Sequence, residues 1–104
     1  MEKHTWQARV RPNMLAEYRR CHDEIWPEMV EVLKSAGIKN YTIWNNGDTL
    51  FGYYECERGY EFAKRVQDES EVVARWNVAM DPIMEFVKDE DGNPIEFDCV
   101  FTLD

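Results

Sequence analysis

The sequence predicts an α+β fold in which an antiparallel sheet of four strands carries its helices on one face. Three observations lead to this prediction. Residues 5–11 and 95–103 alternate apolar and polar side chains, residues 14–36 and 71–80 repeat apolar side chains at three- and four-residue steps, and Asn46-Gly47 separates two strand-like runs. The resulting order, βαββαβ, places antiparallel strands behind one layer of helices.

The first strand is predicted from Thr5 to Arg11. Trp6, Ala8 and Val10 fall on one side of it and polar side chains fall on the other, which is typical of a strand with one buried face. Pro12 has no amide hydrogen to donate to a neighbouring strand, so the strand should end there.

A long amphipathic helix is predicted from Met14 to Ala36, followed by Gly37 as its carboxyl-terminal stop. Pro27 interrupts this helix, because proline lacks an amide hydrogen and its ring collides with the carbonyl group four residues earlier. We therefore expect the helix to kink or restart near Trp26. Such a break leaves carbonyl groups around His22 that need other hydrogen-bond partners.

A β-hairpin is predicted next, with strands over Asn40 to Trp44 and Leu50 to Glu55. The Asn46-Gly47 pair between them favours the positive φ angles of a tight two-residue turn, which makes it the strongest local signal for a hairpin.

The second half of the chain is predicted to hold two helices, a loop and the last strand. The helices cover Tyr60 to Gln67 and Glu71 to Met80, and Ser70 caps the second. Residues 88–94 are a loop by their Gly, Asn and Pro content, and residues 95–103 are the last strand. The side chains of the second helix that should face inward are Val72, Val73, Trp76 and Met80.

The face of the sheet turned away from the helices is predicted to be apolar. We expect this face to carry one aromatic side chain from each strand: Trp6, Trp44, Tyr53 and Phe101. A surface of this kind is unfavourable in water, so we expect two copies to pack sheet against sheet as a twofold homodimer.

Length and charge limit the other possibilities. The 104 residues suit one domain spanning 1–104, and 21 acidic against 12 basic residues give a formal net charge of -9. This charge disfavours nucleic acid and membrane surfaces as partners and favours a neutral or cationic substrate. There is no apolar run of membrane-spanning length and no signal-peptide pattern at the amino terminus, so we expect a cytoplasmic protein. Three widely spaced cysteines match neither a disulfide framework nor a zinc site.

The candidate catalytic group is His22, which lies between Tyr18 and Trp26 at four-residue steps, so the three side chains should share one side of the predicted helix. Histidine titrates near neutral pH, so one imidazole can both give and accept a proton. The alternative is that Tyr18 and Trp26 belong to the core and that His22 is a half-buried structural histidine. No metal-ligand spacing, nucleophile motif or nucleotide-binding glycine loop is present, so we expect no metal and no cofactor.

Several segments together resemble the L-rhamnose mutarotase family: EYRRCHDEIWPEM, LKSAGIKNYTIW, LFGYYECE, ARWNVAMDPIM and VFTLD. The resemblance covers essentially the whole chain, and its most specific part runs from Tyr18 through His22 to Glu28. It implies a ferredoxin-like fold that forms a dimeric α+β barrel. It also implies a cofactor-independent enzyme that interconverts the α and β anomers of a 6-deoxy monosaccharide, with L-rhamnose as the first choice.

The resemblance also implies roles for individual residues. His22 matches the proton donor of the family, Tyr18 and Tyr41 match positions that contact the sugar, and Trp76 matches the first of a tryptophan pair that lines the pocket. The second position of that pair is Asn77 in this sequence, which replaces an apolar surface with an amide that can bind a hydroxyl group.

Three alternatives stay open at this point. Because Asn77 departs from the pattern, the sugar could be L-fucose, which a mutarotase of the same superfamily uses. Related dimeric barrels also include monooxygenases and haem-binding proteins that use His, Trp and Asn. The third alternative is a non-catalytic sugar-binding module in which His22 is structural.

Overall fold

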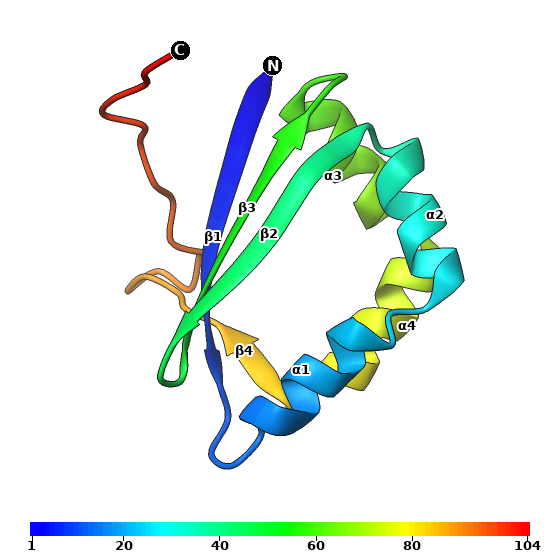
Figure 1. Cartoon of the computed structure of the whole chain (residues 1–104), viewed down its shortest axis with the longest axis vertical. Helices are drawn as coiled ribbons and strands as arrows, with labels where there is room; N and C mark the ends of the chain where they lie inside the picture. Colours follow the sequence, from blue (N-terminus) through cyan, green and yellow to red (C-terminus); the bar gives the residue numbers. More distant parts are fainter.

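The computed structural model describes residues 1–104 as one antiparallel sheet with four helices on one of its faces (Figure 1). The fold is α+β and ferredoxin-like, as predicted. Both termini lie at the same end of the molecule, and the chain after the last strand runs on the side of the sheet away from the helices. The elements are β1 (Glu2–Val10), α1 (Leu15–Asp23), α2 (Pro27–Ser35), β2 (Ile38–Asn46), β3 (Thr49–Cys56), α3 (Tyr60–Asp68), α4 (Glu71–Met80) and β4 (Met84–Phe86).

The strands follow the order β2-β3-β1-β4, and every neighbouring pair is antiparallel. The predicted hairpin of β2 and β3 is confirmed, and both strands extend further than the sequence indicated. Gly47 turns the chain with φ 60°, a backbone conformation that costs glycine little. A β-bulge interrupts the β2–β3 register between Lys39 and Thr42.

The predicted break in the first helix is confirmed as a restart. The amide of Glu24 donates to Arg20 O and closes α1, and Trp26 then adopts an extended backbone (φ -59°, ψ 131°). Pro27 takes the first position of α2, where its missing amide hydrogen would have had no partner within the helix.

The second pair of helices also agrees with the sequence prediction. α3 and α4 begin at the expected residues, and the Ser70 side chain accepts a hydrogen bond from the amide of Val73 at the start of α4. Val73, Trp76 and Met80 are buried, and Val72 is half-buried.

The prediction of a last strand over residues 95–103 is wrong. The fourth strand is β4, which follows α4 after a short turn and pairs with β1 over three residues. Because β4 occupies the free edge of β1, the later segment has no strand beside it within the chain. Val100, Phe101 and Leu103 consequently remain exposed.

Trp6 was also assigned to the wrong face of the sheet. It lies opposite Gly52 in the β1–β3 register, on the same side as Ala8 and Val10, which are fully buried against the helices. Thr5 and Tyr53 form the neighbouring pair and point to the opposite face, because side chains alternate along a strand.

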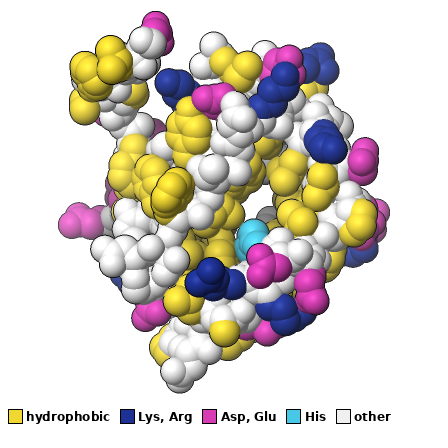
Figure 2. Space-filling view, in the orientation of Figure 1, with side chains coloured by type: hydrophobic (Ala, Val, Ile, Leu, Met, Phe, Trp, Pro, Cys, Tyr) yellow, Lys and Arg dark blue, Asp and Glu magenta, His cyan; other side chains and the backbone are white.

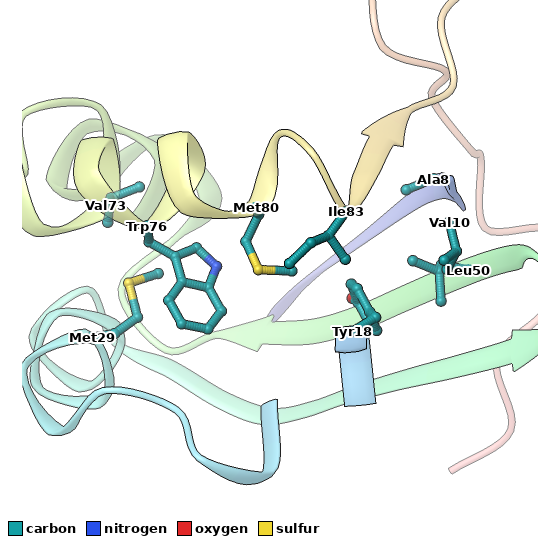
Figure 3. Packing of buried hydrophobic residues seen from close by; sticks show 9 residues of the cluster. All are labelled: Ala8, Val10, Tyr18, Met29, Leu50, Val73, Trp76, Met80 and Ile83. Carbon is teal, nitrogen blue, oxygen red and sulfur yellow. The ribbon is translucent and has the colours of Figure 1, made fainter. Parts of the chain in front are cut away.

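Two groups of buried side chains join the sheet to the helices. The larger group is drawn in Figure 3, where side chains from α1, α2 and α4 meet side chains from β1 and β3. The smaller group lies under α3. The larger group consists of Ala8, Val10, Tyr18, Met29, Leu50, Val73, Trp76, Met80 and Ile83. No helix is both long and apolar enough to cross a bilayer.

Candidate active site

A cavity of about 530 Å³ lies between the sheet and the helices, and most of its lining is hydrophobic. Figure 2 shows the molecule hollowed at its centre, with a histidine and hydrophobic side chains in the hollow and charged side chains around its edge. Cavities that bind small molecules are of this size and mix apolar walls with a few polar groups.

The five residues named from the sequence all line this one cavity: Tyr18, His22, Tyr41, Trp76 and Asn77. They come from α1, β2 and α4. Tyr18 and Trp76 are buried, His22 and Tyr41 are half-buried, and Asn77 lies exposed at the edge of the cavity. The fold therefore gathers residues that are up to 59 positions apart, from Tyr18 to Asn77, around one space.

The imidazole of His22 is held in one orientation. Its Nδ1 lies 3.0 Å from the backbone carbonyl oxygen of Tyr18. A carbonyl group only accepts, so Nδ1 carries the hydrogen and donates it. The ring packs 4.3 Å from the Tyr18 ring, between centroids, and 5.4 Å from the Trp76 ring in an edge-to-face contact. In the neutral ring, Nε2 therefore keeps a lone pair that can accept a proton.

The phenols of Tyr18 and Tyr41 keep their protons across the physiological range. Burial raises the pKa of both phenols well above the ordinary value for tyrosine, and for Tyr41 a hydrogen bond from Trp6 partly opposes this rise. Both groups are thus neutral hydroxyls, which can donate to a ligand oxygen and also accept from a ligand hydroxyl.

Trp26 does not share a helix face with Tyr18 and His22, which corrects the expectation from its four-residue spacing. The helix ends before Trp26, and this side chain does not line the cavity. It supports the cavity from behind, because its indole packs edge-to-face on Trp76 with centroids 5.1 Å apart. The predicted restart at Pro27 thus separates Trp26 from the helix that carries Tyr18 and His22.

Several residues that line the cavity were not predicted from the sequence. Trp6 is the most important of them, and its signal was present, since it alternates with Ala8 and Val10, which are core residues. Methionines 29, 80 and 84 also line the cavity. Their spacing indicates only a buried position, so no sequence signal separates a cavity wall from ordinary core. No group of three or more His, Cys, Asp and Glu side chains lies close enough together to hold a metal ion.

Fold and cavity together define the class of protein: a small ferredoxin-like α+β protein whose cavity holds an imidazole and two phenols among aromatic rings. The family model described as L-rhamnose mutarotase matches residues 3–103. The chain belongs to the L-rhamnose mutarotase family, and it is accordingly an isomerase of the mutarotase class.

Individual relatives agree with this assignment. The chain is 37% identical over 102 residues to an L-rhamnose mutarotase of Rhizobium johnstonii, covering 96% of this chain and 92% of that one. It is 38% identical over 96 residues to an L-rhamnose mutarotase of Tolumonas auensis, covering 90% of both chains. The chain also matches the crystal structure of an L-rhamnose mutarotase from Formosa agariphila, with a TM-score of 0.78 and 23% identity. The match covers 100% of each chain and supports the fold.

Proposed function

We propose that the protein interconverts the α and β anomers of L-rhamnose, with His22 as the general acid and base. The observation that carries the proposal is the fixed imidazole of His22. Its Nδ1 is bound to a backbone carbonyl, so Nε2 is left to exchange a proton inside a cavity that also holds two neutral phenols. The reaction as proposed uses side chains of this chain and solvent water.

Ring opening requires one proton to arrive and another to leave. His22, protonated on Nε2, gives that proton to the ring oxygen as the bond between this oxygen and the anomeric carbon breaks. The anomeric hydroxyl loses its proton to solvent, and its electrons form the aldehyde. The carbonyl group then rotates, and the reverse transfers close the ring to the other anomer, which restores His22 to its starting state.

The remaining groups of the cavity bind and orient the sugar in this proposal. Tyr18 and Tyr41 hold hydroxyl groups, and Trp76 packs against the apolar face of the ring and its methyl group. A positioned acid–base group contributes roughly 10²- to 10⁴-fold in rate, which is sufficient for a reaction that already proceeds slowly in water.

The test is saturation-transfer NMR of anomer exchange on L-rhamnose with the His22→Ala protein. Exchange above the uncatalysed rate should fall by about 10²-fold or more. His4→Ala is the matched control, because His4 stacks on Tyr60 outside the cavity, with ring centroids 4.3 Å apart. Wild-type exchange in a folded His22→Ala protein would contradict the assignment of His22.

L-Fucose is the second candidate sugar, and Asn77 is the reason. This exposed amide stands at the edge of the cavity where the family pattern has tryptophan, and an amide can distinguish hydroxyl configurations through its hydrogen bonds. Exchange rates on L-rhamnose and L-fucose, measured side by side, decide between the two sugars.

The proposal includes a homodimer formed through the face of the sheet opposite the helices. Trp44 is 67% exposed there, Phe51 is 37% exposed, and Phe97 from the tail packs edge-to-face on Phe51. Farther along the tail, Phe101 is 77% exposed. A second copy on this face would remove these groups from water.

A cytoplasmic location is also proposed. All three cysteines are free thiols, including the exposed Cys99, and such thiols persist in a reducing compartment. Recovery of the protein from the periplasmic or secreted fraction of cells would contradict this location.

A further inference from the structure

We propose that Trp6 is a positioning residue: it fixes the hydroxyl of Tyr41 so that Tyr41 donates its hydrogen bond to the sugar. This inference rests on the proposed function, in which Tyr41 binds a sugar hydroxyl. It adds Trp6 as the group on which the direction of that bond depends.

The bond between the two residues sets this direction. Trp6 Nε1 lies 3.0 Å from the Tyr41 hydroxyl oxygen. An indole N–H can only donate, so the phenol oxygen is the acceptor and its own hydrogen must point elsewhere. Both side chains line the cavity, and Trp6 is the one side chain that hydrogen-bonds the phenol. Tyr41 therefore presents a donor to a ligand.

The contact reaches across a whole strand. Trp6 stands on β1 and Tyr41 on β2, and β3 runs between them. The residue of β3 opposite Trp6 is Gly52. A Cβ atom at this position would overlap the Cε2, Nε1 and Cζ2 atoms of the indole. The indole thus lies directly on the β3 backbone, and any larger residue at position 52 would displace it.

Two further features hold the pair in place. Phe86 of β4 packs edge-to-face on Trp6, with centroids 5.5 Å apart and an interplanar angle of 79°. Tyr41 lies within the β-bulge between Lys39 and Thr42. A bulge changes the direction in which a side chain points, and here the phenol meets the indole. The glycine, the bulge and the edge-to-face contact thus all favour this one bond.

The loss of the indole N–H should weaken sugar binding through Tyr41. Trp6→Phe keeps an aromatic ring on Gly52 but removes the donor. A single hydrogen bond typically changes affinity by roughly 3- to 10-fold, so we expect KM and the dissociation constant for L-rhamnose to rise by about that factor, with a smaller change in kcat.

The experiment is a double-mutant cycle of Trp6→Phe and Tyr41→Phe, with KM, kcat and the L-rhamnose dissociation constant measured for each protein. The double variant should bind no more weakly than Tyr41→Phe alone, because Trp6 acts through that hydroxyl. Thr42→Val is the matched control. It removes the acceptor of a second indole bond, from Trp44 Nε1 at 3.1 Å, and Thr42 itself does not line the cavity, so this variant should keep wild-type constants.

A second measurement reports the bond itself. In Tyr41→Phe the indole N–H resonance of Trp6 should move and that of Trp44 should not. Three results would each overturn the inference. The first is a Trp6 resonance that does not move, and the second is wild-type affinity in Trp6→Phe beside weakened affinity in Tyr41→Phe. The third is additive losses of affinity in the double variant.

The failure of the proposed function gives a different pattern. Absence of anomer exchange in the wild-type protein contradicts the proposed reaction. In that case the L-rhamnose dissociation constants of the double-mutant cycle still test the role of Trp6. Wild-type affinity in Tyr41→Phe contradicts the binding role of Tyr41, and this inference with it.

Discussion

At the scale of single residues, three phenols lie in or beside the cavity: Tyr18 and Tyr54 are buried and Tyr41 is half-buried. Burial raises the pKa values of Tyr18, Tyr41 and Tyr54 well above the ordinary value for tyrosine. Tyr41 and Tyr54 also pack together, with ring centroids 5.0 Å apart. The folded state therefore holds these protons more tightly than the unfolded chain does.

This difference predicts a loss of stability in alkali. An unfolded tyrosine ionises near pH 10, so below about pH 10 both states keep the proton and stability is unaffected. Above that pH the unfolded state loses protons that the folded state retains, and the free energy of unfolding falls by up to about 1.4 kcal/mol per pH unit for each phenol. Urea unfolding from about pH 8 to about pH 11 measures this slope. Tyr54→Phe should make it shallower, and an equal slope in that variant would contradict the explanation.

The sequence supports some residue assignments better than others. Tyr18 and His22 lie one helical turn apart, so their proximity follows from the helix period. Trp6 was misplaced because alternation shows which residues share a face but not which face is buried. Tyr41 reaches the cavity through a bulge, which breaks the alternation and has no clear sequence signal. Its place could be inferred only from the resemblance to the family.

At the scale of elements, α4 depends on its amino-terminal cap. Ser70 Oγ accepts from the amide of Val73 at 3.2 Å, and the helix that follows carries Trp76 and Asn77 to the cavity. The cap satisfies one of the amide groups that have no partner inside the helix.

Removal of this cap should destabilise the protein. We expect Ser70→Ala to lower the free energy of unfolding by about 1 kcal/mol, measured by urea denaturation. Ser35→Ala is the control, because the Ser35 hydroxyl donates to Val32 O at the exposed end of α2 and caps no amide. Its effect should stay within about 0.5 kcal/mol. Equal losses in the two variants would contradict the role of the cap.

Helix ends were more predictable than strand partners. Pro27 and Ser70 act on their immediate neighbours, so local chemistry is enough to place the restart and the cap. The prediction of the last strand was wrong because alternation in residues 95–103 gives no information on which strand would pair with this segment. The strand that pairs with the edge of β1 is β4, which has only three residues. So short a strand shows too little alternation of apolar and polar side chains to be predicted.

At the scale of the whole molecule, the apolar groups on the free sheet face and the tail lie on one side. The helices cover the other side (Figure 1). Val100 is 95% exposed and Leu103 is 83% exposed, so the last residues of the tail gain little burial within their own chain. Groups of this kind favour association with another surface.

Light scattering at micromolar concentration should therefore give the mass of two chains. We expect Phe101→Ser to shift the protein toward monomer. Val78→Ser is the control, since Val78 is 75% exposed but belongs to α4, away from this face. A wild-type protein that stays monomeric, or an equal effect of the two substitutions, would contradict the proposed dimer.

The methionines of the cavity wall have a consequence for the sugar itself. A pyranose and its open aldehyde differ in length and breadth, and a site that holds both must change its outline during turnover. Met29, Met80 and Met84 can follow that change by rotation about their own side-chain bonds, while the backbone around them stays still. We expect the same adaptability to let the cavity accept sugars of similar outline, so that the polar groups at its edge set the selectivity.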